Sequence, residues 1–162
     1  MPSDAPRAPT SPDEVRAWLE QYERSLTAAE RRSLDATGVT WSGAFAAEGG
    51  VYAVWEGRTP IYVGESSSVA LRMGDIRRPV NHPFPKKVCA EHGLEPGDLT
   101  ALALFMSSRY TISSLPVLFG RRELEEYLVL RWRRFVLNRP ARRLRQSPQY
   151  GWVEPLVEPP SA

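Results

Sequence analysis

Two short segments, Gly50-Val51-Tyr52 and Tyr62-Val63-Gly64, constrain the fold of this 162-residue chain more than any other feature. Val51, Ala53 and Trp55 alternate with Tyr52 and Val54, which is typical of a β-strand. Glu56-Gly57-Arg58 supplies a turn, and residues 59–63 fit a return strand with a proline near its start. The pattern predicts a β-hairpin that carries two tyrosines ten residues apart, each close to a glycine.

Most of the segments around this hairpin are predicted to be helical. Ser11-Pro12-Asp13-Glu14 combines a serine N-cap, a proline at the first helical position and acids in the first turn. Residues 69–73 fit a short helix, and residues 121–136 repeat apolar side chains at spacings of three and four. The hydrophobic run 99–106 is predicted as a buried strand, with a helix as the alternative. Prolines within residues 77–98 predict an irregular segment.

These elements predict the fold class and the domain organisation. We expect an α/β (α+β) protein in which helices flank a small, mainly antiparallel three-stranded sheet. The chain length favours one domain with a substantial core. The expected parts are a disordered tail over residues 1–10, an N-terminal helical extension over 11–48, a main domain over 49–145 and a C-terminal tail over 146–162.

Composition excludes several classes of site. A single cysteine, Cys89, excludes an internal disulfide, and His82 and His92 are too isolated to form a Cys/His zinc cluster. No apolar run is long enough to span a bilayer, and the N-terminus lacks the apolar region of a signal peptide. We therefore expect an intracellular, cytoplasmic protein with no membrane partner.

The charge of the chain is uneven, although its net value is only +2. Residues 1–70 carry six Lys/Arg and ten Asp/Glu, whereas residues 71–162 carry fifteen and nine. Seven arginines fall between Arg131 and Arg145. Such asymmetry favours a polyanionic partner for the second half of the chain. The alternative is a solvated helix face followed by a basic tail, and charge alone does not separate the two.

Four ordered elements of the sequence resemble a known family. The chain contains GVY, nine further residues, YVG and then ESSSVALR, so that Arg72 lies ten residues after Tyr62. This arrangement resembles the signature of the GIY-YIG nuclease superfamily. Glu126 and Asn138, twelve residues apart in EYLVLRWRRFVLNRP, are similar to the glutamate and asparagine found in several branches, including the excision-repair nuclease. The resemblance covers about residues 49–140.

The resemblance implies a metal-dependent endonuclease that hydrolyses DNA phosphodiesters with Mg²⁺ or Mn²⁺, in a restriction-like or repair setting. It implies that Glu126 holds the metal and that Arg72 forks onto phosphate oxygens. Tyr52 would accept a proton from the attacking water, and Tyr62 would position that water or relay the proton. Asn138 would support the site by fixing the end of the glutamate helix.

Structural alternatives accompany these assignments. The two tyrosines could be aromatics at the core edge, and Asn138 could be a helix C-cap. Glu126 has acidic neighbours at positions 123 and 125, and only its separation from Asn138 selects it. Many family members carry a histidine or tyrosine four residues after the arginine, where this chain has Ile76; His82 is the nearest replacement as a proton-transfer helper.

Two clusters of basic residues could bind a DNA backbone. They comprise Arg77, Arg78, Lys86 and Lys87, followed by Arg131, Arg133, Arg134, Arg139, Arg142, Arg143 and Arg145. The rival hypothesis is a non-catalytic DNA-binding or protein-interaction module that retains the fold. A nuclease should bring the tyrosines, Arg72 and Glu126 together, whereas in a binding module Glu126 could point away. RNA cleavage and the oligomeric state, including a homodimer, stay open.

Overall fold

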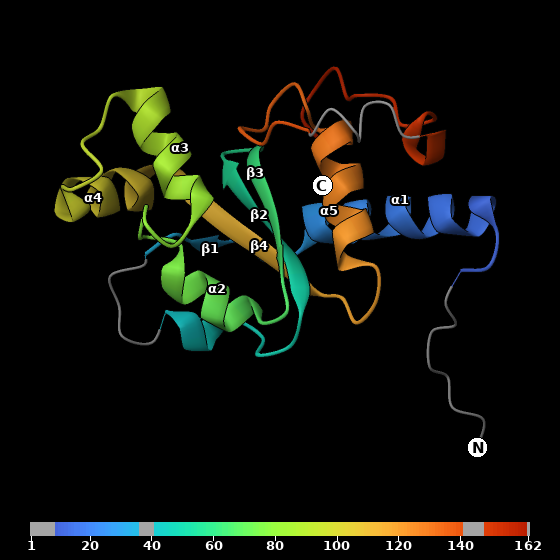
Figure 1. Cartoon of the computed structure of the whole chain (residues 1–162), viewed down its shortest axis with the longest axis horizontal. Coiled ribbons are helices and arrows are strands. Elements are labelled where there is room, and N and C mark those ends of the chain that lie inside the picture. Colours follow the sequence, from blue (N-terminus) through green and yellow to red (C-terminus); the bar gives the residue numbers. More distant parts are fainter. Residues whose placement is uncertain (1–8, 36–40, 141–147, 162) are drawn as a thin grey trace.

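The computed structural model describes residues 9–35, 41–140 and 148–161 (Figure 1). Their element order is α1 (Pro12–Ala28), β1 (Arg32–Ser33), the 3₁₀ helix η1 (Ser42–Ala44), β2 (Gly50–Glu56), β3 (Thr59–Ser66), α2 (Val69–Asp75), α3 (Pro83–His92), α4 (Leu99–Arg109), β4 (Tyr110–Pro116), α5 (Arg121–Arg131) and the 3₁₀ helix η2 (Pro148–Tyr150). The predicted mixed α/β class is confirmed.

The sheet is antiparallel, with strand order β1-β4-β2-β3. The predicted hairpin is β2 and β3, which pair from Gly50 opposite Ser66 to Glu56 opposite Thr59. The prediction of three strands is wrong, because the two-residue strand β1 adds a fourth along β4. Strand β3 forms the other edge, so one side of its backbone is open to contacts from outside the sheet.

The run predicted as a buried strand over residues 99–106 forms helix α4 instead, which was the stated alternative. Asp98 caps this helix, since its carboxylate accepts the N–H of Ala101 at 2.9 Å. Leu102 and Met106 are buried four residues apart, which matches the helical period. Leucine, alanine and methionine are also strong helix formers, so the hydrophobic run had no β-branched bias toward a strand.

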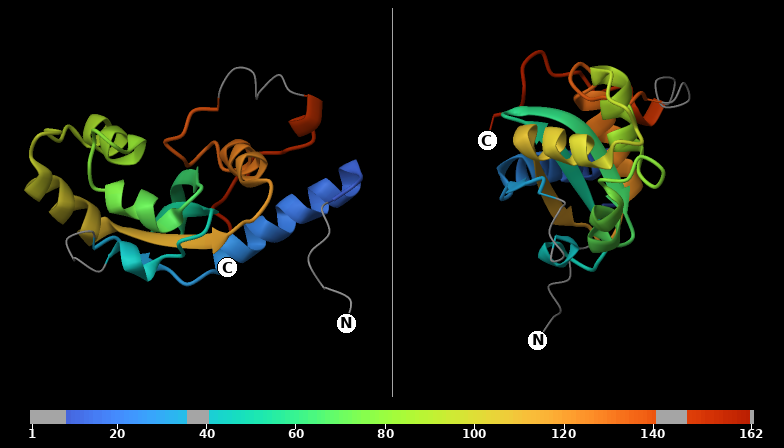
Figure 2. Two further views of the ribbon diagram at one scale, coloured as in Figure 1. Left: turned by 60° about the horizontal axis from the view of Figure 1, so that its bottom comes forward. Right: turned by 90° about the vertical axis from the view of Figure 1, so that its left-hand side faces the viewer.

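Two cores lie on opposite faces of the sheet. Side chains alternate along β2, so Tyr52 and Val54 enter one core while Val51, Ala53 and Trp55 enter the other. Helices α2, α3 and α4 lie on the Tyr52 face, and α1 and α5 lie on the Trp55 face (Figures 1 and 2). The sheet therefore separates two helical layers, and α5 also contacts its β3 edge.

Helix α1 is part of the second core. Its predicted start is confirmed, because the Ser11 hydroxyl accepts the Glu14 N–H at 3.2 Å. The buried carboxylate of Glu23 accepts the Tyr127 hydroxyl and, at 2.8 Å, the Trp132 indole N–H. These bonds tie α1 to α5 and to the turn that follows it. Along the C-terminal segment, buried Tyr150 and partly buried Trp152, Val153 and Leu156 pack on the same core.

Helix α3 lies within the segment predicted as irregular. His82 is its N-cap, Pro83 occupies the first position and Pro85 the third. The first turn of a helix has no intrahelical acceptor for its N–H groups, so prolines there cost little. Helix α5 ends at Arg131 rather than at Val136. No helix in the described part of the chain combines the length and the apolar character needed to cross a membrane.

Candidate functional site

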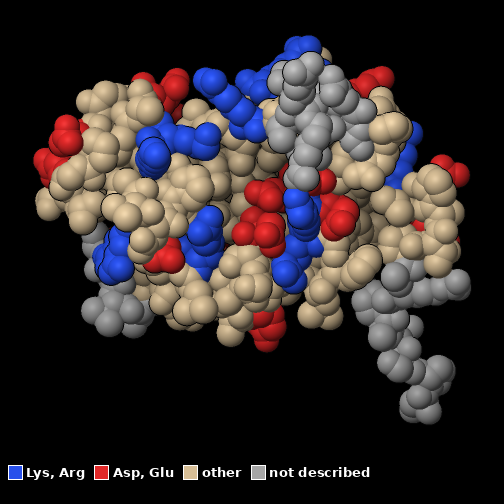
Figure 3. Space-filling model, viewed as in Figure 1, with Lys and Arg blue, Asp and Glu red and all other residues tan. Residues whose placement is uncertain are grey.

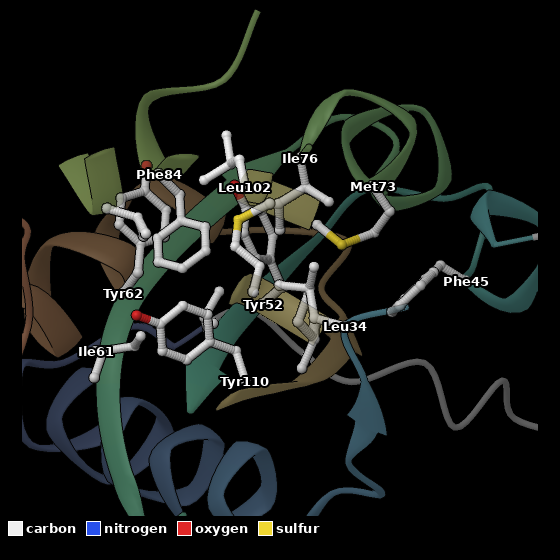
Figure 4. Close-up of a cluster of buried hydrophobic side chains, with 14 of the residues drawn as sticks. Leu34, Phe45, Tyr52, Ile61, Tyr62, Met73, Ile76, Phe84, Leu102 and Tyr110 are labelled. Carbon is white, nitrogen blue, oxygen red and sulfur yellow. The ribbon is translucent and has the colours of Figure 1, made fainter. Parts of the chain in front are cut away.

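The hairpin brings the two tyrosines together. Tyr52 on β2 lies opposite Gly64 on β3, and Tyr62 lies two residues earlier on the same face, with ring centroids 6.4 Å apart. A Cβ on Gly64 would lie 2.2 Å from the Tyr52 hydroxyl oxygen. A glycine is required there because the phenol packs directly on the β3 backbone. Figure 4 shows both rings in the first core, with Phe84 close to Tyr62.

Arg72 reaches this pair from α2. Its Nη1 donates to the Asn81 carbonyl at 3.4 Å, and its Nε is buried without a hydrogen-bond partner among the described residues. The guanidinium lies close enough to the Tyr52 hydroxyl to oppose the rise in that group's pKa. The guanidinium is half-buried and interacts with Tyr52, and its remaining N–H groups are suited to an anionic oxygen.

His82 contacts Tyr52 and has a defined protonation. Its Nδ1 accepts the Phe84 N–H at 3.0 Å, and its Nε2 lies 2.7 Å from the Tyr52 hydroxyl oxygen. The first bond requires a bare Nδ1, so the neutral ring carries its proton on Nε2 and donates to Tyr52. Burial, assisted by Arg72, lowers the pKa of His82 to about 3. His82 therefore donates to the phenol. Ile76, at the position where many family members carry a histidine or tyrosine, is fully buried in the first core.

Both phenols resist ionisation. Burial, followed by the neighbouring Tyr62, raises the pKa of Tyr52 well above its ordinary value, and Arg72 acts in the opposite direction. Burial, followed by Glu125, raises the pKa of Tyr62 to about 12. The two side chains are 0% and 5% exposed, respectively. Only additional positive charge would make a phenolate accessible near neutral pH.

Helix α5 contributes a carboxylate to this group, and that residue is Glu125. Its pKa is raised to about 7 by burial and then by the charges of Glu65 and Glu126, against the attraction of Arg72 and Arg122. Glu125 in turn raises the pKa of both tyrosines. Glu125 therefore interacts electrostatically with both tyrosines and with Arg72.

Glu126, the carboxylate selected from the sequence, has other partners. It accepts the Tyr150 hydroxyl at 3.0 Å and pairs with Arg122 at 3.4 Å. The structure therefore directs Glu126 toward the C-terminal segment, whereas Glu125 is the α5 carboxylate that raises the pKa of both tyrosines. The position along the helix does not tell which of the two glutamates faces the tyrosines. Each has a buried residue four positions later, Val129 after Glu125 and Leu130 after Glu126. The distinguishing contact comes from η2, far away in the sequence.

Asn138 supports β3 rather than the helix. Its Oδ1 accepts the Val63 N–H and its Nδ2 donates to the Val63 carbonyl, both at 2.9 Å. The expected role at the end of the glutamate helix is wrong, because α5 ends seven residues earlier and its C-cap is Trp132. The amide instead satisfies both outward backbone groups of the residue next to Tyr62, on the open edge of the sheet.

The donor set fits a hydrated magnesium ion. No group of three or more His, Cys, Asp or Glu side chains in the described ranges could together hold a metal ion. Mg²⁺ does not require such a cage, since it retains waters and uses one or two carboxylates with substrate phosphate oxygens. Burial, followed by the neighbouring carboxylates of Glu65 and Glu126, raises the pKa of Glu125, and a divalent cation would favour its ionised form. Glu65, its strongest charged neighbour, pairs with Arg121 at 3.2 Å.

On the face shown in Figure 3, acids gather centrally over β3 and α5 with basic groups among them, and further basic groups lie on either side. Among the predicted DNA contacts, Arg133, Arg134 and Arg139 are exposed. Arg131 has a structural role, because it donates to the Glu154 carbonyl and pairs with Glu23. The segment 141–147, with its three predicted arginines, Arg142, Arg143 and Arg145, lies outside the described residues. In the first basic cluster, Arg78 and Lys86 are exposed and Arg77 and Lys87 are half-buried.

Comparison of the chain with protein-family models, with curated proteins and with solved structures finds no match. The function has to be inferred from the residues and their geometry. The group to be explained is two buried phenols, a neutral histidine, a half-buried arginine and a carboxylate of raised pKa.

Proposed function

We propose that this chain is a metal-dependent endonuclease of the GIY-YIG type that hydrolyses DNA phosphodiester bonds. The supporting observation is the meeting of Tyr52, Tyr62 and Arg72 with Glu125 at the β3 edge. Four separate elements supply these side chains. Burial of polar groups lowers the stability of a fold, so a contribution to stability does not explain why they gather here. Perturbed ionisable groups with a shared partner are typical of functional sites.

In this proposal, Arg72 binds the scissile phosphate. The half-buried guanidinium donates to a phosphate oxygen, and its fixed positive charge offsets the charge that develops on phosphorus. Glu125 holds the metal with one carboxylate, in place of Glu126. When bound, Mg²⁺ supplies charge that polarises the phosphate and steadies the leaving oxygen.

Tyr52 acts as the acceptor of the water proton. The water oxygen forms a bond to phosphorus as its proton passes to the phenolate, and the bond to the leaving oxygen breaks. Two donors favour the phenolate, namely the Nε2–H of His82 and the guanidinium of Arg72. His82 is thus a positioning residue. It holds the Tyr52 oxygen ready to accept the water proton, and it does not itself accept and release that proton. Tyr62, beside Glu125, orients the attacking water.

A second candidate is a nucleic-acid-binding module that retains the fold without cleaving. Two observations favour it: Glu126 is bound by Tyr150 and Arg122, and Tyr52 is 0% exposed. Under this hypothesis Arg72 still binds a phosphate, but no proton moves. The two candidates therefore agree on affinity for nucleic acid and differ only in cleavage.

Cleavage mapping on end-labelled DNA and RNA duplexes, with Mg²⁺, Mn²⁺ or EDTA, tests the proposal. We expect metal-dependent cleavage of DNA, lowered about a hundredfold or more by Arg72→Ala because the phosphate loses the cation that binds it. Arg58→Ala is the matched control, since Arg58 is exposed in the hairpin turn. Binding without metal-dependent cleavage would select the binding module, and cleavage of RNA alone would replace the DNA assignment.

A further inference from the structure

Helix α4 has a second apolar face that the described part of the chain leaves uncovered. The helix begins with LTALALFM, which is apolar almost all round, and such helices are normally buried on every side. Here only Leu102 and Met106 are buried, whereas Leu99 is 53% exposed and Leu104 is 66% exposed. In the right-hand view of Figure 2, α4 lies in front of the sheet. Its exposed face is therefore a candidate for contact with another molecule.

The exposed face of α4 forms part of a groove with a volume of about 410 Å³. The α4 side chains that line it lie one or four residues apart and so form one stripe along the helix: Leu99, Thr100, Ala103 and Leu104. Arg77 and Arg78, in the loop between α2 and α3, complete the lining, and these six residues are termed the α4 groove. Both leucines are more than half exposed, so a small molecule bound here would keep much of its surface in water. The α4 groove therefore suits the flank of a larger partner.

The α4 groove is bordered by charges of both signs. Arg78 is exposed, and so are Glu95 and Asp98 in the turn that leads into Leu99, where the Glu95 carbonyl accepts the Asp98 N–H at 3.1 Å. None of these three side chains forms an ion pair within the described residues. A polyanion would meet the two acids, and a polycation would meet the arginine. A second copy of the chain satisfies both signs, because in a two-fold pair the same patch faces itself.

We propose that the α4 groove is the interface of a two-fold dimer of this chain. The two α4 helices lie antiparallel, so that Leu104 of each copy packs against Leu99 of the other and all four leucines leave the water. Arg78 of each copy pairs with the acidic helix start, Glu95 and Asp98, of the other. A standard interface takes about 800 Å² from each partner. One face of an eleven-residue helix with its flanking loop is smaller than that, so the dissociation constant should be on the order of 10 µM.

Sedimentation equilibrium from about 1 to 200 µM protein tests the apolar part of the interface. The wild-type protein should pass from monomer to dimer over this range. The double variant Leu99→Ser with Leu104→Ser removes four leucines from each dimer and should raise the dissociation constant about tenfold or more. The matched control is Leu118→Ser with Phe119→Ser, a pair that is 82% and 68% exposed in the loop between β4 and α5. This control should keep the wild-type constant. All four side chains are exposed, so both double variants should stay folded.

Charge reversal tests the pairing of Arg78 with the acidic helix start. Arg78→Glu alone sets acids against acids in its homodimer, and Glu95→Lys alone sets cations against cations, so each variant should dimerise more weakly than the wild type. An equimolar mixture of the two should form a heterodimer, because both cross-contacts then join opposite charges. A structural effect of either substitution within its own chain would not be reversed by mixing.

Three results would overturn the inference: a wild-type protein that stays monomeric over the whole range, a dimer that survives the leucine double variant, and loss of the dimer in the Leu118/Phe119 control. A mixture of the charge variants that associates no better than either variant alone would overturn the proposed pairing. Every readout is association rather than cleavage, so the inference does not depend on the proposed function, and the two can fail separately.

Discussion

Replacing Glu125 with glutamine should stabilise the metal-free protein at neutral and alkaline pH. Burial and neighbouring carboxylates raise the pKa of Glu125 from an ordinary value of 4.5 to about 7. Each pH unit between these values is worth about 1.4 kcal/mol, so ionising Glu125 in the folded protein costs up to about 3 kcal/mol. Glutamine removes this cost with little change in shape. Allowing for partial exposure, we expect a gain of about 1–2 kcal/mol at pH 8.

The sign follows from proton binding. Between pH 4.5 and pH 7 the folded state holds the Glu125 proton more tightly than the unfolded state does. The stability from this group is complete below pH 4.5 and is lost as the pH rises through 7. Urea denaturation in EDTA at pH 4.5 and pH 8 should therefore show the variant and the wild-type protein nearly equal at the lower pH. The variant should have the higher midpoint at pH 8.

Glu126→Gln is the matched control. Its carboxylate accepts the Tyr150 hydroxyl and pairs with Arg122, so the variant should lose stability at pH 8. Addition of Mg²⁺ should raise the midpoint of the wild-type protein and of Glu126→Gln but not that of Glu125→Gln. A Glu125→Gln protein that is no more stable than the wild type at pH 8, or that gains equally at both pH values, would refute the reasoning.

Three further substitutions probe the supports of the site, each measured by urea denaturation and DNA cleavage. Asn138→Ala removes both bonds to Val63 and should cost about 1–3 kcal/mol; unchanged stability would contradict a support role. Gly64→Ala places a methyl group 2.2 Å from the Tyr52 oxygen and should cost about 1–3 kcal/mol and abolish cleavage; a fully active variant would show that Tyr52 need not pack there. Glu23→Ala leaves two buried donors unsatisfied and should cost about 3–5 kcal/mol, which a near-neutral result would exclude.

Local sequence patterns predicted the elements that local physics controls. The hairpin, the Ser11 cap of α1 and the short helix α2 are all confirmed, because alternation, a capping side chain and a turn act within a few residues. The convergence of Tyr52 and Tyr62 is a direct consequence of the hairpin register. The helix α4 was missed because a Leu/Ala run lacks the periodicity that separates a buried strand from a helix.

The remaining features depend on contacts between distant segments. Glu125 and Glu126 are adjacent, and the contact that distinguishes them comes from Tyr150, at the far end of the chain. The role of Asn138 depends on the open edge of β3, which the sequence does not show. His82 was found as a candidate, but its donor role follows only from the Phe84 N–H that it accepts. Pro83 occupies the first position of α3, where a proline is readily accommodated, so the prolines read as helix breakers instead include one at a helix start.

The central claim is that Glu125, together with the tyrosines and Arg72, forms a metal-dependent cleavage site. Nicking of supercoiled plasmid with Mg²⁺, compared among the wild type, Glu125→Gln and Glu126→Gln, tests it most directly. We predict that Glu125→Gln lowers the nicking rate about a hundredfold or more, while Glu126→Gln nicks at close to the wild-type rate. Loss of nicking in Glu126→Gln with retention in Glu125→Gln, or a wild-type protein that does not nick, would contradict the claim.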